Sequence, residues 1–179
     1  MKKNKNILLI ITGSIAAYKS LELIRLLRDN NYGVNCILTE GGKMFVTPLS
    51  VAALSESPVY ENIFSLKDET EMGHIRLSRE ADLVVVAPAS ADIIGKMANG
   101  LADDLASTVL LATNKDVLVA PAMNLMMWKN KAVQRNVKQL KNDGVVFVGP
   151  ASGKLACGEE GEGRMAEVKE IFNTIQKMI

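Results

Sequence analysis

Residues 7–14 read ILLIITGS, and this stretch decides the fold. Five consecutive aliphatic residues predict a strand that is buried on both faces, as in a parallel sheet covered by helices. The following Gly13 and Ser14 are typical of a tight turn that leads into a helix. From Ala16 to Asn30, leucine and isoleucine lie opposite charged residues, which predicts an amphipathic crossover helix. The stretch therefore predicts the first strand and helix of a parallel α/β sheet.

The alternation of short aliphatic runs with longer amphipathic segments continues along the whole sequence. The predicted strands span residues 7–11, 34–38, 83–87, 117–120 and 145–148. The predicted helices span residues 16–30, 49–54, 91–97, 105–112, 132–142 and 166–177. This order predicts an α/β fold, a single doubly wound Rossmann-like domain over residues 1–179 with a parallel sheet flanked by helices. Residues 150–165 are rich in glycine and are expected to form a mobile loop.

Composition points to local binding sites rather than to a charged or membrane-bound surface. Of 179 residues, 48% are hydrophobic and 23% are charged, and the 21 basic and 20 acidic residues leave a net charge of +1. A field this weak does not attract nucleic acid or an anionic membrane. The apolar run 7–11 is too short for a secretory signal or a membrane span. We therefore expect a cytoplasmic protein in which Cys36 is a small buried hydrophobic residue.

The turn after the first strand has the chemistry of a phosphate site. Backbone amides around Gly13 and Ser14, together with a helix N-terminus, favour an anion. Their spacing fits neither the dinucleotide fingerprint nor the P-loop, which argues against NAD and nucleoside triphosphates. Thr39, at the end of the second predicted strand, could add a hydroxyl to the same anion. The alternatives are structural, namely a serine that caps a helix and a threonine that ends a strand.

Three later segments carry unusual turns, and the only histidine lies among them. A predicted strand continues into Pro-Ala-Ser-Ala-Asp at 88–92, whose small residues would let a flat ring approach the backbone. The next strand ends in Pro-Ala-Met-Asn at 121–124, and a late loop at 156–165 reads ACGEEGEGRM. His74 begins the sequence His-Ile-Arg-Leu. Since the carboxyl ends of parallel strands meet at one edge of the sheet, the turns are expected to form a ligand site.

Taken together, these segments resemble the homo-oligomeric flavin-containing cysteine decarboxylases, a family that includes phosphopantothenoylcysteine decarboxylases and the peptidyl-cysteine decarboxylases of lantibiotic maturation. The resemblance covers residues 13–165. Its most specific marks are the 121–124 motif, the motif that begins at His74 and the 156–165 loop, which resembles a substrate clamp. It implies FMN as the cofactor, no metal, and the oxidative decarboxylation and re-reduction of 4'-phospho-N-pantothenoylcysteine to 4'-phosphopantetheine in coenzyme A biosynthesis.

The resemblance implies three catalytic residues. His74 would help to deprotonate the substrate thiol, because an imidazole with a pKa of about 6.5 is largely neutral near pH 7. Asn124 would hold the substrate carboxylate through its amide, without the excessive ground-state stabilisation that a lysine would give. Cys157 would protonate the enethiolate, since a thiol with a pKa of about 8.5 stays mostly protonated. The structural alternatives are a packed histidine and an asparagine that caps a helix.

Flavin supplies what the substrate lacks. Loss of CO2 leaves an electron pair on the α-carbon of cysteine, and the neighbouring CH2–SH group cannot absorb it, so an electron sink is required. The expected cofactor-binding residues are Gly13, Ser14, Ile15, Thr39, Pro88, Ala89, Ser90, Ala91 and Met123. The expected substrate-binding residues are Asn124, Ala156, Cys157, Gly158, Arg164 and Met165, with Arg164 as the candidate for the substrate phosphate.

The resemblance also implies partners. It implies homotrimers or dodecamers with FMN between neighbouring subunits, and a CTP-dependent phosphopantothenate–cysteine ligase domain in a longer protein. A peptidyl-cysteine decarboxylase is the first alternative, because the length and contents of the clamp set substrate size. A flavin prenyltransferase is disfavoured by Asn124 and Cys157. A flavoprotein that inhibits a phosphatase without catalysis is disfavoured because His74, Asn124 and Cys157 are all present.

Overall fold

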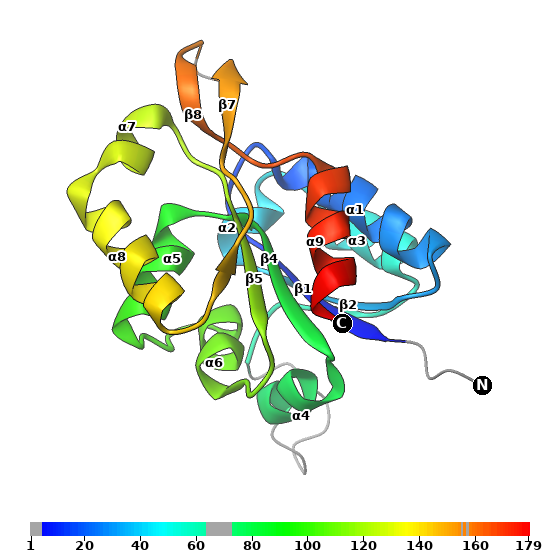
Figure 1. The fold of residues 1–179 in the computed structure, drawn as a ribbon. Coiled ribbons are helices and arrows are strands. Elements are labelled where there is room, and N and C mark those ends of the chain that lie inside the picture. Colours follow the sequence, from blue (N-terminus) through cyan, green and yellow to red (C-terminus); the bar gives the residue numbers. More distant parts are fainter. Residues whose placement is uncertain (1–4, 64–72, 155, 157) are drawn as a thin grey trace.

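Six parallel strands form the central sheet of the computed structural model, which describes residues 5–63, 73–154, 156 and 158–179 (Figure 1). The strands are β1 (Asn6–Ile11), β2 (Gly33–Leu38), β3 (Val59–Tyr60), β4 (Leu83–Ala89), β5 (Val117–Pro121) and β6 (Val146–Phe147). Their order across the sheet is β3-β2-β1-β4-β5-β6, and every neighbouring pair is parallel. The predicted parallel α/β fold is confirmed.

The two central strands are buried along almost their whole length. All residues of β4 are buried, and so are all but the first residue of β1. Successive side chains of β1 point to opposite faces, so that Ile7 and Leu9 belong to one hydrophobic cluster, whereas Leu8 and Ile10 belong to another. Because both faces are covered, these strands consist of continuous aliphatic runs rather than alternating ones.

Helices cover both faces of the sheet (Figure 1). One face carries α1 (Ala17–Asp29), α3 (Pro48–Ser55) and α9 (Val168–Met178). The other carries α4 (Gly73–Glu80), α5 (Ala91–Asn99), α6 (Leu105–Ala112) and α8 (Lys131–Asn142). The buried side of α1 includes Leu23 and Leu27, and Ser20 Oγ on the same side donates a hydrogen bond of 2.7 Å to the Ala87 carbonyl of β4. This hydrogen bond fixes α1 against β4, the neighbour of the strand β1 that α1 follows.

Short elements follow the carboxyl ends of the strands. α2 (Glu40–Lys43) follows β2 and α7 (Leu125–Lys129) follows β5. Between β6 and α9, β7 (Ala151–Lys154) and β8 (Glu160–Arg164) form an antiparallel hairpin. The segment 150–165, which was expected to form a mobile loop, thus contains two strands. With glycine at 153, 161 and 163, the segment lacks the alternation of apolar and polar side chains by which a strand is predicted.

Element length explains the other differences between prediction and structure. β3, α2, α4 and α7 were not predicted, and each has eight residues or fewer, too few to show a clear period. The longer helices lie within a few residues of their predicted bounds. In the part of the chain that the structure describes, no helix has both the length and the apolar character that crossing a bilayer requires.

Candidate active site

The central strands β1 and β4 end at the point where the strand order reverses. From β1 the chain passes through α1 to β2 on one side, and from β4 it passes through α5 and α6 to β5 on the other. Connections that diverge in this way leave a crevice at the carboxyl ends of the strands, where open α/β sheets bind ligands. Two adjoining cavities lie here, and Gly13, Ser90 and Ala91 line both of them.

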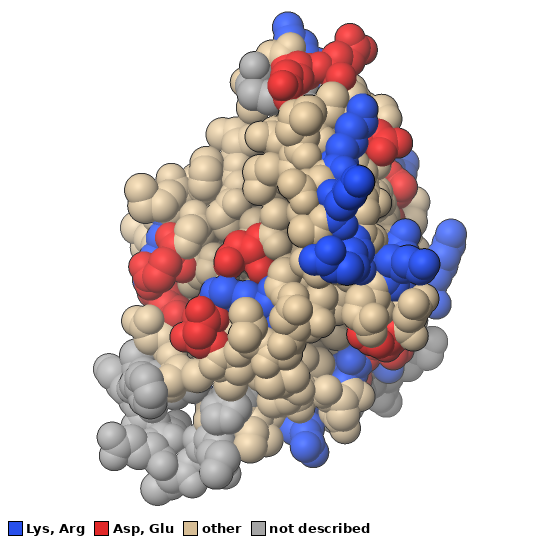
Figure 2. All heavy atoms as spheres, turned by 90° about the vertical axis from the view of Figure 1, so that its left-hand side faces the viewer, with Lys and Arg blue, Asp and Glu red and all other residues tan. Residues whose placement is uncertain are grey.

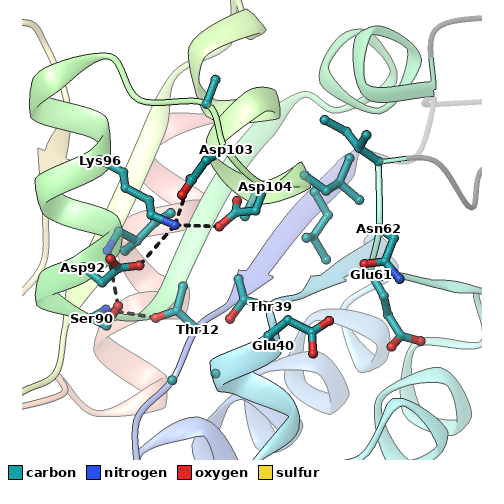
Figure 3. A pocket seen from close by; sticks show the side chains of 18 of the residues that line it. Thr12, Thr39, Glu40, Glu61, Asn62, Ser90, Asp92, Lys96, Asp103 and Asp104 are labelled. Atoms are coloured by element: carbon teal, nitrogen blue, oxygen red, sulfur yellow. Dashed lines mark hydrogen bonds and ion pairs between the residues drawn. The ribbon is translucent and has the colours of Figure 1, made fainter.

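The larger cavity, of about 1100 Å³, has an acidic wall (Figure 3). The acidic residues that line it are Glu40, Glu61, Asp92, Asp103 and Asp104. Lys96 is the one basic side chain among the described residues of this lining. Its Nζ lies 2.9 Å from Asp103 Oδ1, 2.9 Å from Asp104 Oδ2 and 3.5 Å from Asp92 Oδ2. Lys96 thus joins the three aspartates, whereas Glu40 and Glu61 lie across the cavity (Figure 3) and each pair with Lys43 at 2.6 Å.

These contacts keep the cluster charged. The hydrogen bond to Asp103 raises the pKa of Lys96, and the same bond lowers the pKa of Asp103. Burial alone would raise the pKa of Asp104, but hydrogen bonds from the Ser107 N–H and from Lys96 outweigh it and lower that pKa. The network therefore stays ionised at neutral pH and ties α5 to the start of α6.

The smaller cavity, of about 510 Å³, has the opposite charge. Lys19, Lys154 and Arg164 line it, and its described lining contains no acidic residue. Asn124 and Met123 lie in the same wall. On the face shown in Figure 2, a column of basic side chains stands apart from a group of acidic side chains that surrounds a basic one. The two halves of the crevice are therefore suited to different chemical groups.

Thr12 joins the ends of the two central strands. Its Oγ1 donates a hydrogen bond of 2.8 Å to the Pro88 carbonyl and accepts one of 2.9 Å from the Ser90 N–H. Ser90 in turn caps α5, because its hydroxyl accepts a hydrogen bond from the Ile93 N–H. The turn that holds Ser90 and Ala91 is thereby fixed beside the turn that holds Gly13, as the sequence predicted for the carboxyl edge of the sheet.

Glycines let two turns approach each other at the floor of the crevice. A Cβ on Gly13 would lie 3.1 Å from the Cα of Gly41, and a Cβ on Gly42 would lie 2.6 Å from the Ile11 carbonyl oxygen. Thr39 caps α2, with Oγ1 accepting a hydrogen bond of 3.1 Å from the Gly42 N–H. Thr39 was expected in the site, whereas Gly41 and Gly42 were not, although the sequence shows a Gly-Gly pair a few residues after the second strand.

The N-terminus of α1 is open. Ser14 does not cap this helix: its Oγ accepts a hydrogen bond of 3.2 Å from the Ala16 N–H, and the helix begins at Ala17. Ala16 provides no side-chain cap, and the first turn contains no acidic residue. The Ala17 N–H donates to the Ser14 carbonyl and the Lys19 N–H to the Ala16 carbonyl, both at 3.0 Å, so the helix offers an anion its positive dipole end rather than a row of free N–H groups.

Asn124 is held in one orientation by the helix that it starts. It is the N-cap of α7, and its Oδ1 accepts a hydrogen bond of 2.8 Å from the Met127 N–H. The capping alternative is thus observed, but it uses only the oxygen of the amide. Nδ2 has no hydrogen-bond partner among the described residues, and Asn124 lines the smaller cavity. The cap therefore leaves an amide donor for a ligand.

The β7–β8 hairpin docks onto the turn that carries Asn124. The Met123 N–H donates a hydrogen bond of 3.0 Å to the Gly163 carbonyl, and Trp128 Nε1 donates one of 3.2 Å to Glu162 Oε2. A Cβ on Gly161 would lie 2.8 Å from a Leu125 methyl group. Two motifs that are far apart in the sequence thus form one wall of the smaller cavity.

The remaining expected residues divide between the cavities and the strands. Ile15, Ala156 and Met165 line the smaller cavity, and Thr39 lines the larger one. Pro88 and Ala89 are buried at the end of β4 and belong to neither described lining, and neither does Gly158, which is exposed. The sequence analysis assigned no role to Lys19, Lys154 or Lys96, and no local pattern distinguishes them from surface lysines.

Two of the three expected catalytic side chains lie outside the described residues. The backbone of His74 belongs to α4, and nothing further is described of its side chain. Cys157 is itself outside the described part of the chain. Figure 1 shows α4 and the β7–β8 hairpin at opposite ends of the molecule. Within one subunit, the helix that carries His74 is therefore remote from the hairpin.

Cys36 has no place in the site. It is fully buried in β2, as predicted, and burial raises the pKa of its thiol to about 12, partly offset by a hydrogen bond with Ser55. A thiol with this pKa is neither a nucleophile nor a metal ligand at neutral pH. Its contribution is that of a small apolar side chain.

Comparison with known proteins gives consistent matches. The family described as Flavoprotein matches residues 1–179. The "Coenzyme A biosynthesis bifunctional protein CoaBC" of Haemophilus influenzae is 46% identical over 176 residues, which are 98% of this chain and 44% of that protein. This chain therefore spans less than half the length of that relative.

Two solved structures are similar over nearly their full length. A mutant PPC decarboxylase complexed with pantothenoylaminoethenethiol has a TM-score of 0.88 and 32% identity, with 98% of both chains covered. "The FMN binding protein AtHal3" has a TM-score of 0.85 and 33% identity, with 98% of this chain and 96% of that chain covered. The fold described above is thus shared with a PPC decarboxylase and with an FMN binding protein.

Proposed function

Because this chain belongs to the flavoprotein family, we propose that it binds FMN and uses it to decarboxylate 4'-phospho-N-pantothenoylcysteine to 4'-phosphopantetheine in coenzyme A biosynthesis. The coenzyme A biosynthesis relative and the PPC decarboxylase structure support the substrate, and the FMN binding protein supports the cofactor. One observation carries the proposal: the β7–β8 hairpin closes on the Asn124 turn over a cavity that begins at Gly13 and Ser90.

The crevice suits FMN in size and in chemistry. Ligand cavities are typically about 300–1,000 Å³, and the two adjoining cavities reach this range. The N-terminus of α1, which has no side-chain cap and no acidic residue in its first turn, offers a positive dipole end to a phosphate. The close contact of Gly13 with Gly41 leaves bare backbone against which a flat ring can lie. We assign FMN to Gly13, Ser14, Ile15, Thr39, Ser90, Ala91 and Met123, with Pro88 and Ala89 fixing the turn before Ser90.

When bound, FMN supplies the electron sink that decarboxylation of a cysteine requires. Asn124 binds the departing carboxylate. Since the Met127 N–H occupies Oδ1, Nδ2 is the group left to donate a hydrogen bond to a ligand in the cavity. A neutral donor suits a group that leaves as neutral CO2, because it does not stabilise the carboxylate more than the transition state.

His74 and Cys157 take the proton-transfer roles in this proposal. His74 accepts the proton of the substrate thiol, and Cys157 in the clamp returns a proton to carbon in the final reduction. Ala156, Gly158 and Met165 form the rest of the clamp around the substrate. Because α4 and the hairpin lie at opposite ends of the molecule in Figure 1, the proposal places His74 of a neighbouring subunit beside this hairpin.

We therefore include a homo-oligomer, a trimer or dodecamer, in the proposal. Exposed apolar side chains support it: Ile15, which lines the smaller cavity, is 59% exposed, Met44 is 81% exposed and Leu49 is 79% exposed. A second subunit that covers these side chains would also exclude water from the cofactor. The oligomeric state is measurable by light scattering.

The whole protein is proposed to have two further properties. The relative's description as bifunctional supports a CTP-dependent phosphopantothenate–cysteine ligase domain in the same protein, with residues 1–179 as the decarboxylase unit. The reaction is assigned to the cytoplasm, where substrate and enzyme thiols stay reduced.

Mass spectrometry of the product tests the proposal. The FMN-loaded protein is incubated with 4'-phospho-N-pantothenoylcysteine, and the product is expected to be lighter by CO2 alone. Cys157→Ser should instead release a product lighter by CO2 and two hydrogens, because the final reduction lacks its proton donor. Unchanged substrate mass with wild-type protein, or colourless protein that ignores added FMN, refutes the proposal.

A second substrate separates the proposal from its alternative. A peptide that ends in cysteine is offered to the same protein under the same conditions. Loss of CO2 from the peptide but not from the phosphorylated compound would make the chain a peptidyl-cysteine decarboxylase. Loss from the phosphorylated compound alone supports the coenzyme A assignment.

A further inference from the structure

The basic side chains of the smaller cavity come from three separate elements. Lys19 lies in the first turn of α1, Lys154 ends β7 and Arg164 ends β8. They are concentrated in one cavity of a chain whose net charge is only +1. The adjoining cavity has the opposite character, since Lys96 there is surrounded by carboxylates. A uniform basic surface does not explain this separation.

Glu167 connects two of these cations. Its Oε2 lies 3.1 Å from Lys19 Nζ, and its Oε1 lies 2.5 Å from Arg164 Nη2. The Lys19 side chain is only 13% exposed, so it is held beneath the surface rather than extended into solvent. The hydrogen bond from Lys19 lowers the pKa of Glu167, which therefore remains ionised. The carboxylate fixes the positions of both cations before any ligand binds.

The charges at this place match a phosphate monoester. Three cations and one shared carboxylate leave two positive charges, and a phosphate monoester carries about −1.5 to −2 at neutral pH. Arg164 and Lys19 still have N–H donors beyond those given to Glu167, and Lys154 makes no ion pair within the described residues. The site can therefore bind a dianion by charge-assisted hydrogen bonds.

We infer that Lys19, Lys154 and Arg164 form the subsite for the terminal phosphate of the substrate, with Glu167 as the residue that positions Lys19 and Arg164. The inference rests on the proposed function. Two of the three cations belong to the hairpin that docks on the Asn124 turn, so carboxylate and phosphate are bound by one continuous wall. Most of the residues assigned to FMN come from the turns of the central sheet, and they line another part of the same cavity.

Binding without turnover tests the subsite. The affinity of the FMN-loaded protein for 4'-phosphopantothenate and for pantothenate is measured by calorimetry, since neither compound contains the cysteine that reacts. We expect the phosphorylated compound to bind at least about tenfold more tightly, because charge-assisted hydrogen bonds are about twice as strong as those between neutral groups. In Lys19→Gln/Arg164→Gln and in Lys154→Gln/Arg164→Gln, this preference should fall to about threefold or less.

Two controls separate a phosphate subsite from general effects. Lys138→Gln removes one positive charge from α8, outside the described lining of both cavities, and should keep the full preference. Affinity for pantothenate should be unchanged in every variant, which shows that the site is intact. Equal affinity of wild-type protein for both compounds, or a full preference in the double variants, overturns the inference.

The phosphate of FMN is the other source of the same chemistry. Affinities for FMN and riboflavin are therefore measured on the apo form of the same variants. If the double variants lose only the preference for FMN over riboflavin, these cations bind the phosphate of the cofactor, and the substrate assignment is overturned. If the phosphate preference depends on these cations while wild-type protein releases no CO2, the proposed function fails and the subsite stands.

Discussion

Met123 and Gly163 are joined through their backbones, with the Met123 N–H donating a hydrogen bond of 3.0 Å to the Gly163 carbonyl. A Cβ on Gly163 would lie 2.3 Å from the Met123 carbonyl oxygen. Gly163 also has a φ of 142°, in the region that favours glycine. The contact therefore admits no side chain, and it sets how closely the hairpin approaches the Asn124 turn.

Gly163→Ala is expected to lower the free energy of unfolding by about 1–3 kcal/mol, through backbone strain and the close contact. It should weaken substrate binding, because Lys154 and Arg164 lie on the displaced hairpin, and should leave FMN affinity within about twofold. Urea unfolding, substrate KM and flavin fluorescence titration measure these effects. Gly144→Ala is the matched control, since Gly144 also has a positive φ, of 91°, but open space around it. Equal effects of the two substitutions would contradict this account.

Asn124→Asp separates the two roles of this side chain. Aspartate caps a helix as well as asparagine does, so the free energy of unfolding should change by less than about 0.5 kcal/mol. The variant lacks the Nδ2 donor and places a negative charge against the substrate carboxylate, so the decarboxylation rate should fall by about 10²-fold or more. Asn124→Ala should lose activity and also about 1 kcal/mol of stability with the cap. Wild-type turnover by the aspartate variant would refute the carboxylate role.

The ion network around Lys96 gives a pH-dependent prediction. Lys96→Met removes the partner of Asp103 and Asp104 and should cost about 1–2 kcal/mol at pH 7, given the limited exposure of the lysine. The pKa values of both aspartates are lowered in the folded state, so their contribution is complete above the ordinary carboxyl pKa of about 3.9. It is lost as the pH falls through the lowered values.

Urea unfolding of wild type and Lys96→Met at a series of pH values measures this contribution. The difference between the two proteins should be constant from pH 7 to about pH 5 and should shrink below about pH 4. Lys138→Met serves as the control for a lysine outside the cluster. A difference that is independent of pH down to acid unfolding would show that packing, not charge, explains the effect.

Cys36 should be inert to alkylation while the protein is folded. With a pKa of about 12, its thiolate fraction at pH 8 is about 10³-fold below that of a free cysteine, and burial blocks access as well. Cys157→Ser isolates this thiol. We expect no labelling by iodoacetamide under native conditions and full labelling in denaturant, both followed by intact mass. Rapid native labelling would contradict the buried position.

The central sheet was predictable because its strands are covered on both faces and so consist of unbroken aliphatic runs, as in β1 and β4. The hairpin was not predictable, because glycine has a low propensity for strands. Gly161 and Gly163 are needed there because a side chain would collide with Leu125 or with Met123. Such a requirement exists only once the partner is in place, and the partner is far away in the sequence.

The site was predictable to a similar extent. The turns at Gly13, Ser90 and Asn124 carry local motifs, and the topology brings all three to one crevice. The pairing of Lys19 with Glu167 joins residues that are 148 positions apart, and no local pattern indicates it. One cavity is acidic and the other basic because the fold gathers residues that are distant in the sequence, so the structure was needed to find this difference.

The β7–β8 hairpin is a separate two-stranded sheet, so its strands are not needed to complete the ladder of the main one. Its sequence can change without disturbing the scaffold, provided that glycine is kept where it meets the Met123 turn. Exchange of the hairpin between homologous proteins would therefore alter the part of the cavity wall that holds Lys154 and Arg164, while Lys19 and Asn124 stay on the scaffold.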